Sequence, residues 1–251
     1  MRLKRNSFQG VLNIIRFNCH FYVSACVIIL VLLLLAGSIF ESFQKLVLAG
    51  VLLALVVSSI SLLVSFYVYD LSDLYQLNWV SSLERSKVLN INAGFDETSR
   101  LIKEKFPTID LIICDFYDST RHTELSIKRA RLLYPPILET IPVSTSLLPF
   151  SNSTFDKSLA IFSAHEIRDR NERVQFFTEL SRITKISGQI LVTEHLRDFN
   201  NFLAYNIGFF HFYSRKDWLY TFKQANLVVA QEFKVTPFIT IFILNKNGDS
   251  I

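Results

Sequence analysis

The sequence predicts a membrane-attached α/β protein, in which a transmembrane helical hairpin precedes one domain with a mostly parallel sheet covered by helices on both faces. Three observations predict this fold class. Two long runs without a charged residue lie close together near the N-terminus, and strand-like and helix-like segments alternate after them. The last two strand-like segments follow each other with no helix between them, which predicts one antiparallel edge strand.

The composition agrees with a chain that partly faces lipid. Of 251 residues, 50% are apolar and only 19% are charged, and the mean hydropathy is +0.31. A soluble domain usually carries about 25% charged residues. Seven glycines, six prolines and three cysteines exclude a disordered chain, a collagen-like repeat and a disulfide scaffold. Cys19, Cys26 and Cys114 show no paired spacing, which predicts reduced thiols in a protein that faces the cytosol.

The distribution of charge argues against nucleic acid as a partner. Five basic residues and one acidic residue precede Asp70, and the rest of the chain carries 21 of each kind. The net charge of +4 therefore belongs to the N-terminal segment, and the domain that follows is neutral. Binding to nucleic acid depends on neutralising phosphates, so a neutral domain is a poor candidate for it.

Residues 1–69 are expected to form a basic N-terminal segment and two transmembrane helices at about 21–40 and 46–69. These runs reach roughly 30 and 36 Å as helices, which is enough to cross a bilayer of about 30 Å. Residues 41–45 are expected to form the loop between them. Because Arg2, Lys4, Arg5 and Arg16 precede the first run, the positive-inside rule places the N-terminus and the following domain in the cytoplasm. A buried hairpin of a soluble protein is the alternative.

Residues 70–251 are expected to form one α/β domain. It should begin with a helix over 70–84, where leucine and valine recur at helical spacing. Apolar runs predict strands at 88–92, 110–114, 141–143, 157–163, 189–194, 227–235 and 238–244. Amphipathic patterns predict helices at 97–106, 123–133 and 171–183, and Ser214 with Asp217 forms a capping box for a helix reaching about residue 225.

Several motifs lie along this order of elements: VLNINAGFDET at 88–98, Cys114-Asp115, LPFSNSTFD at 148–156, FSAHEIRD at 162–169 and FTELSRITKISGQILVTE at 177–194. With these motifs, roughly residues 77–244 resemble the class I S-adenosylmethionine-dependent methyltransferases of the type 11 kind. The resemblance implies a Rossmann-like methyltransferase fold with a seven-stranded sheet, and S-adenosylmethionine as the cofactor.

The resemblance also implies where the cofactor binds. Ligands of open parallel sheets bind beyond the carboxyl ends of the strands. Small residues after the first strand let a cofactor approach the backbone, and an acidic side chain at the next strand tip can accept hydrogen bonds from ribose hydroxyls. The cofactor-binding residues expected on this basis are Asn90, Asn92, Ala93, Gly94, Asp115, Phe116, Ser144, Thr145 and Ser163. Asp115 could instead cap the next helix, and the Asn92-Ala93-Gly94 motif is too short to be specific on its own.

Three departures from the family pattern argue against catalytic activity. Asn90 replaces the usual acidic residue, Asn92 replaces the first glycine, and residues 185–188 (KISG) replace K-P-G-G. A catalytically silent, membrane-anchored protein that keeps the fold for binding or scaffolding is therefore the alternative to an active methyltransferase. A transporter is a third hypothesis, but the two apolar runs lack the charged residues expected of a transport pathway.

His165 and Glu166 follow the fourth strand and are the candidate catalytic residues. A general base is needed only if the methyl acceptor must lose a proton, and histidine has the suitable pKa near neutral pH. Packing or capping at the strand end is the alternative for His165, and favourable electrostatics with the next helix for Glu166. Because a second histidine of an H-E-x-x-H motif and any C-x-x-C are missing, no metal site is expected.

The segment after the fifth strand, residues 194–213, is densely aromatic. Tyr205, Phe209 and His211 are expected to line the substrate pocket, as part of an apolar lid over a lipophilic small-molecule acceptor. Packing in the core and contact with the membrane surface are the alternatives. The sequence leaves the acceptor and the oligomeric state open.

Overall fold

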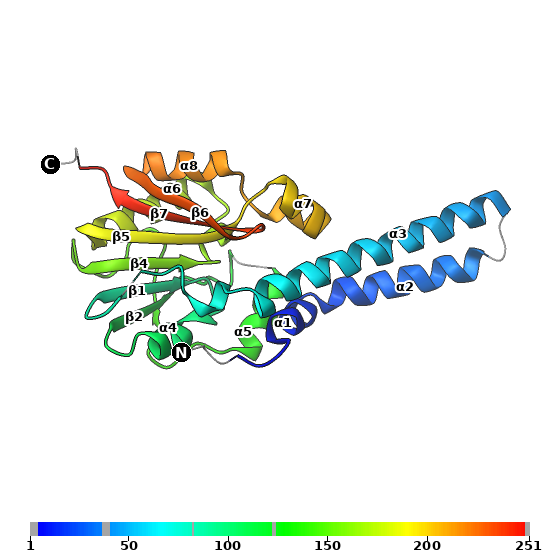
Figure 1. Ribbon diagram of the computed structural model, residues 1–251, viewed down its shortest axis with the longest axis horizontal. Coiled ribbons are helices and arrows are strands. Elements are labelled where there is room, and N and C mark those ends of the chain that lie inside the picture. The colour runs from blue at the N-terminus through cyan, green and yellow to red at the C-terminus, as the bar shows by residue number, and fades with distance from the viewer. Residues whose placement is uncertain (1–4, 37–40, 82, 122–123, 249–251) are drawn as a thin grey trace.

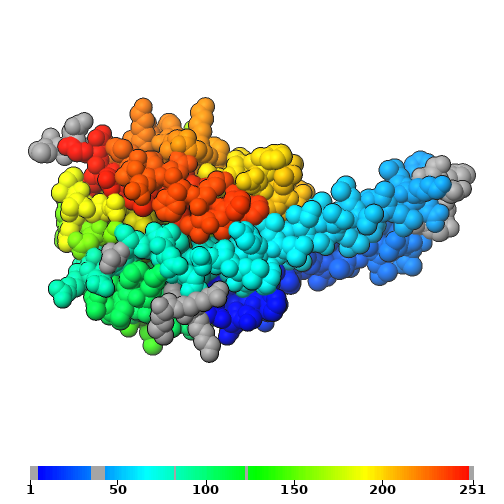
Figure 2. All heavy atoms as spheres, viewed as in Figure 1, coloured from blue at the N-terminus to red at the C-terminus, as the bar shows by residue number. Residues whose placement is uncertain are grey.

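The computed structural model describes residues 5–36, 41–81, 83–121 and 124–248. A globular α/β part contains the sheet, and the helices α2 (Cys19–Ala36) and α3 (Glu41–Phe66) project from one end of it as a long pair (Figures 1 and 2). The short helix α1 (Gln9–Phe17) lies at the base of this pair, beside α5 (Figure 1).

The globular part is built on one seven-stranded sheet with the strand order β3-β2-β1-β4-β5-β7-β6. Its strands are β1 (Lys87–Asn92), β2 (Asp110–Asp115), β3 (Ile141–Pro142), β4 (Phe155–Ile161), β5 (Thr184–His195), β6 (Leu227–Thr236) and β7 (Ile239–Lys246). Strands β1 to β5 run parallel to one another, as predicted. The order reverses between β1 and β4, which makes their carboxyl ends the expected place for a ligand.

The antiparallel strand differs from the prediction in its position. Strand β7 is antiparallel to both β5 and β6 and lies between them, so the antiparallel strand is internal and β6 forms the edge. The hairpin through Thr236 and Pro237 explains this order, because β7 is almost wholly buried while much of β6 is exposed. The more apolar strand takes the internal place.

Helices connect and cover these strands. Those of the globular part are α4 (Thr98–Lys105), α5 (Leu125–Leu133), α6 (Arg170–Ile183), α7 (Phe199–Tyr205) and α8 (Arg215–Gln224), with short helical turns η3 (Ala164–Glu166) and η4 (Asn206–His211). The Asp169 side chain caps α6 by accepting the N–H of Glu172, and Ser214 and Asp217 form the predicted capping box of α8.

Two apolar cores lie on the two faces of the sheet. On one face α6 and α8 contribute Phe176, Phe177, Trp218 and Phe222, which pack against alternate residues of the strands. On the other face α4 and the segment 68–83 pack against the remaining strand residues. Continuous burial of the central strands follows from this double cover.

The predicted helix over residues 70–84 is wrong. Helix α3 ends in a π-helical turn, η1 (Tyr67–Leu71), and a single 3₁₀ turn follows at η2 (Leu74–Gln76). Leu77 has a left-handed backbone conformation (φ 53°), which an α-helix does not allow. The leucines at helical spacing are nevertheless buried, because the irregular chain lies directly on the sheet.

The predicted interhelical loop at 41–45 is also wrong, because these residues form the first turn of α3. Among the described residues, the helical stretch Phe43–Gln76 is long and apolar enough to span a membrane, with a mean hydropathy of 2.7 and only 6% of its most apolar window buried in the molecule. Helices α1 and α2 bend by 68° at their break, and Gln9–Phe17 with Cys19–Leu34 would make a second such stretch only if the two are taken together as one span. The predicted end of the first span and two of its flanking cations, Arg2 and Lys4, lie outside the described residues.

Helix α1 is fixed to the globular part by two carboxylates. Asp70 accepts the backbone N–H groups of Gly10 and Val11, so it caps the first turn of α1. Glu97 accepts hydrogen bonds from Arg5, Gln9 and Asn13 on one oxygen and from the Tyr75 hydroxyl on the other, at 2.9–3.1 Å. The N-terminal segment is therefore anchored to the domain by polar contacts as well as by the chain.

Candidate functional site

The predicted strand tips meet at one edge of the sheet. Asn92 at the end of β1 pairs in register with Asp115 at the end of β2, and the N–H of Phe116 donates to the Asn92 carbonyl at 3.0 Å. The Ser163 hydroxyl, just after β4, donates to the Ile91 carbonyl at 2.9 Å. Three of the predicted cofactor segments therefore converge on the carboxyl end of β1.

The crevice between Gly94 and Asp115 is filled by Tyr117. Gly94 has a φ of +93°, and a Cβ atom there would lie 2.8 Å from the Tyr117 ring. The Tyr117 N–H donates to Asp115 at 2.8 Å, and the Arg131 guanidinium lies 4.6 Å from the centre of the Tyr117 ring while it pairs with the Asp115 carboxylate. Asp115 itself is only 5% exposed. Its carboxylate thus satisfies a backbone donor and a cation of the chain itself.

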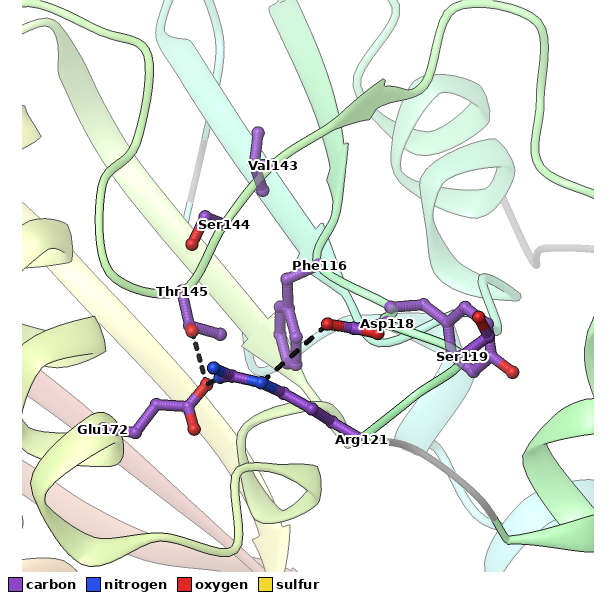
Figure 3. A pocket seen from close by; sticks show the side chains of 9 residues that line it. Phe116, Asp118, Ser119, Arg121, Val143, Ser144, Thr145 and Glu172 are labelled. Carbon is purple, nitrogen blue, oxygen red and sulfur yellow. Dashed lines mark hydrogen bonds and ion pairs between the residues drawn. The ribbon is translucent and has the colours of Figure 1, made fainter.

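A pocket of about 410 Å³ opens next to this crevice, between the loops that follow β2 and β3 (Figure 3). Phe116, Val143, Ser144 and Thr145 contribute to its wall, together with the loop 117–121. Glu172, in the first turn of α6, accepts the Thr145 hydroxyl at 2.5 Å and pairs with Arg121 at 2.6 Å. The pocket is lined by Ser144 and Thr145, two of the cofactor-binding residues that the resemblance implies.

Asn90, Asn92 and Ala93 have different surroundings. The buried Asn90 amide donates to the hydroxyls of Thr98 and Ser99, so it ties β1 to the start of α4 and does not face the pocket. Asn92 accepts the Gly94 N–H at 3.1 Å, while its own Nδ2 is buried and has no hydrogen-bond partner among the described residues. Ala93 is buried. Of the three, only Asn92 offers an unused polar group at the strand tip.

A second polar cluster lies beyond β4 and β5. His165 Nδ1 contacts the carboxylate of Glu194 at 2.7 Å, and His165 Nε2 lies 3.3 Å from Glu166. His211, at the end of η4, places its Nε2 3.7 Å from the same Glu166 oxygen. The Arg168 guanidinium contacts the His211 ring. The fold therefore brings together both predicted catalytic residues and one predicted substrate residue.

The electrostatics of this cluster change the expected role of His165. Burial opposes the charged imidazole, but the carboxylates of Glu194 and Glu166 outweigh it and raise the pKa of His165 to about 10. Burial likewise opposes ionisation of Glu166, but hydrogen bonds with His165 and His211 hold its pKa well below the usual range. With a proton on both ring nitrogens at neutral pH, His165 is a hydrogen-bond donor and lacks the free nitrogen of a general base.

The aromatic segment divides into a buried and an exposed part. Tyr205 packs against His195 and Phe212, with ring centroids 5.1 and 5.7 Å apart, and belongs to the interior. Phe209 stacks edge-on between Phe202 and Phe210. The side chains that α7 and η4 expose to solvent are mostly large and apolar: Phe199, Phe202, Leu203, Ile207 and Phe210. Helix α7 also contacts α3, so this apolar surface lies beside the base of the helical pair (Figure 1).

Three residues with a clear place in these sites were not predicted. Tyr117 and Arg131 close the crevice, and Glu194 supports His165 from the end of β5. Glu194 is 1% exposed. An acidic residue at the carboxyl end of an apolar strand was a usable signal for Glu194. The sequence carries no comparable signal for Tyr117 or Arg131, because their role depends on how a loop and a helix fold back.

Comparisons with known proteins support the fold. No protein-family model matches the sequence, and no curated protein matches it. Among solved structures, a SAM-dependent methyltransferase from Aquifex aeolicus is similar with a TM-score of 0.53 at 14% identity, over 75% of this chain and 97% of that one. The PH0226 protein from Pyrococcus horikoshii OT3 has a TM-score of 0.50 at 17% identity, over 68% of this chain and 85% of that one. The globular part thus has the fold of the class I SAM-dependent methyltransferases.

Proposed function

We propose that this protein transfers a methyl group from S-adenosylmethionine to a lipophilic small molecule at the cytoplasmic face of a membrane. The observation that carries the proposal is the arrangement at the carboxyl edge of the sheet. A carboxylate, Asp115, ends β2, and a pocket of about 410 Å³ opens directly beside it between Phe116 and Thr145. This is the place where open parallel sheets bind nucleotide-like ligands.

The residues at this edge fit the cofactor in three respects. The pocket beside Phe116 suits an adenine ring, Asp115 suits the ribose hydroxyls, and the buried Asn92 amide is a donor without a partner among the described residues. The fit also requires a rearrangement, because Tyr117 fills the space next to Gly94 and the Asp115 carboxylate is already paired with Arg131. Both side chains lie partly at the surface, so rotation of the two can free the crevice without moving a strand.

When bound, S-adenosylmethionine supplies an electrophilic methyl group on a sulfonium, and positioning then contributes much of the rate. The chain's own residues have three tasks. Asp115 and Asn92 hold the cofactor, and the aromatic segment around Phe209 encloses an apolar acceptor. His165, held as a cation between Glu194 and Glu166, donates hydrogen bonds and orients a polar atom of the acceptor. The arrangement favours this orienting task for His165 over proton abstraction.

Membrane attachment is part of the same proposal. Large apolar side chains cover the outside of α2 and α3, with exposed fractions of 65% for Phe21, 71% for Leu34 and 64% for Leu53. Soluble monomers rarely expose continuous apolar surfaces of this extent. Arg5 and Arg16 flank the first apolar run, which favours a cytoplasmic N-terminus. Two crossings then return the domain to the same side.

Binding and transfer test the proposal separately. The full chain in detergent micelles is titrated calorimetrically with S-adenosylmethionine, alongside the variants Asp115→Ala and Asp110→Ala. Asp110 begins the same strand and lies at its exposed opposite end, so it is the matched control. We expect binding to the native chain and to Asp110→Ala, and loss of binding in Asp115→Ala. Absence of heat with the native chain contradicts the proposal.

One observation favours a second function, that of a catalytically silent binding protein. The crevice beside Gly94 is closed by the chain's own Tyr117 and Arg131. The two functions are separated by incubating the protein with methyl-labelled cofactor and a lipid extract of membranes. Labelled lipophilic product that depends on Asp115 eliminates the silent protein. Cofactor binding without any labelled product in extracts favours it.

A further inference from the structure

We propose that His165, Glu166 and His211 form a binding site for a divalent transition-metal ion of the Zn²⁺ type. The three side chains come from two segments, the turn η3 after β4 and the end of η4 after β5. One ligand atom of each lies within 4.8 Å of the other two. The spacing of the three residues along the sequence does not indicate this site, because the second histidine follows the first only after a helix, a strand and a further helix.

The spacing of these atoms suits a tetrahedral ion. A ligand sphere with bonds of about 2.0–2.1 Å places neighbouring ligand atoms about 3.4 Å apart. The Glu166 carboxylate oxygen lies 3.3 Å from His165 Nε2 and 3.7 Å from His211 Nε2. The three ligand atoms all lie within 4.8 Å of one another, so rotations of the side chains can bring the two histidines to the same spacing. Two imidazoles and one carboxylate favour zinc and its neighbours over Mg²⁺ or Ca²⁺, which prefer oxygen ligands.

An independent feature of the site is a carboxylate behind each histidine. His165 turns its Nδ1 to the buried Glu194 at 2.7 Å, and Glu194 also accepts the His165 backbone N–H at 3.2 Å. His211 Nδ1 lies 3.4 Å from Glu124, and the Arg168 guanidinium, which pairs with Glu124, contacts the same nitrogen at 2.5 Å, so Nδ1 faces Glu124 fully only once Arg168 has moved. In both rings Nε2 therefore faces Glu166. Metal-binding histidines characteristically donate their other ring N–H to a carboxylate, which fixes the ring and strengthens the ligand.

Charge also favours a divalent cation here. Glu124, Glu166 and Glu194 place three carboxylates around the two rings, and Arg168 brings one guanidinium to the outer side. Arg168 lies 2.7 Å from His211 Nε2, so it occupies one of the ligand positions. Its side chain is 41% exposed and can turn into solvent. An ion entering the site therefore displaces Arg168.

Three protein ligands leave a fourth position for water or for an oxygen of another molecule. This role rests on the proposed function: an ion there replaces the Nε2 proton of His165 and, in place of the His165 cation, would polarise an oxygen of the methyl acceptor and favour its ionised form. The metal site itself does not depend on that function. Its test uses no cofactor and no acceptor, so failure of one proposal is distinguishable from failure of the other.

The test is a titration of the full chain, purified in detergent without a histidine tag and freed of metal with a chelator. Co²⁺ is added first, because its visible absorption reports nitrogen and oxygen ligands in a four- or five-coordinate site, and Zn²⁺ is then added to displace it. We expect about one equivalent of Co²⁺ to bind and Zn²⁺ to remove the absorption. Absence of the Co²⁺ spectrum, or an equal affinity for Mg²⁺, overturns the proposal.

Four variants locate the site. His211→Gln should weaken Co²⁺ binding at least about 100-fold, and Glu194→Gln, which keeps the shape of the supporting residue, about 10- to 100-fold. Arg168→Gln should bind Co²⁺ as tightly as the native chain or more tightly. His20→Gln, at the start of α2, is the matched control and should leave binding unchanged. Circular dichroism checks that each variant is folded. Native-like binding by a folded His211→Gln variant refutes the assignment.

Discussion

Replacement of Tyr117 by alanine should make the protein bind S-adenosylmethionine more tightly. The Tyr117 ring fills the crevice beside Gly94, and the Arg131 guanidinium covers its other side. If the cofactor binds in this crevice, the ring must first move out. A ligand that binds only the open form has its affinity reduced by the fraction of molecules that are open. Without the Tyr117 ring, the affinity for the cofactor is no longer reduced in this way.

The size of the effect follows from the contacts that hold the ring. A cation–π contact at a partly exposed site contributes about 0.5–1 kcal/mol. Partial burial of the aromatic ring against Gly94 contributes about 1 kcal/mol more, since full burial of a large apolar side chain is worth about 1.5–3 kcal/mol. Together these favour the closed form by about 1.5–2 kcal/mol. Tyr117→Ala should therefore lower the dissociation constant of the cofactor roughly tenfold to thirtyfold.

The assay is calorimetric titration of the native chain, Tyr117→Ala and Tyr117→Phe in the same detergent. Tyr117→Phe keeps the ring that contacts Gly94 and should stay within about threefold of the native affinity. A Tyr117→Ala variant that binds no more tightly than the native chain refutes the closed-crevice argument. A weaker affinity indicates instead that the Tyr117 ring stacks on the bound cofactor.

Three further predictions concern the anchor, the histidine cluster and the membrane. Glu97→Ala removes the shared acceptor of four side chains and should cost α1 about 2–3 kcal/mol. Hydrogen exchange in α1 should therefore accelerate roughly 30- to 150-fold, while the surface control Glu104→Ala leaves it unchanged. Because the folded-state pKa of His165 is raised above its unfolded value, the stability it contributes is fully present below about pH 6.5 and is lost as the pH rises towards about 10. In metal-free protein, the stability difference between the native chain and Glu194→Gln, measured by denaturant unfolding, should shrink over this range, and a constant difference contradicts the assignment. Cys26 is exposed on α2. In intact membranes it should resist labelling by a water-soluble maleimide, and it should react after solubilisation in denaturant. Rapid labelling in intact membranes argues against insertion of α2.

The regular part of the fold could be predicted from the sequence because its signals are local. Continuous apolar runs identified the parallel strands, and the capping box at Ser214 identified the start of α8. The position of β7 could not be predicted in this way, because either strand of the last hairpin could have paired with β5. The prediction of a helix over residues 70–84 failed for another reason. Its leucines are spaced as in a helix, but burial against the sheet, and not helical hydrogen bonding, determines their conformation.

Only those parts of the candidate site that lie at the ends of strands could be predicted from the sequence. The sequence placed Gly94, Asp115 and Ser163 near each other, and the register of β1 with its neighbours confirms that these positions converge. The contacts of side chains that enter from elsewhere were not predictable, including the contact of His211 with Glu166, although His211 itself was expected at the substrate pocket. Tyr117 arrives through a loop, and His211 reaches Glu166 through the turn at η4. The expectation that no metal site exists rested on the absence of the H-E-x-x-H and C-x-x-C motifs, whereas the ligands of the proposed site belong to separate segments.

Helix α5 connects the base of the helical pair with the closed crevice, which raises the question of whether the hairpin controls cofactor entry. Arg129 donates to the Phe17 carbonyl at 2.9 Å and contacts His20, whereas Arg131, two residues later, pairs with Asp115. The α5 backbone is thus held from the hairpin side, so rotation of the Arg131 and Tyr117 side chains is the least costly way to open the crevice. On this argument Glu97→Ala, which loosens α1, should change cofactor affinity by no more than about twofold, as expected for independent sites. An affinity gain as large as that of Tyr117→Ala would mean that α5 moves together with α1 and that the crevice opens from the side of the helical pair.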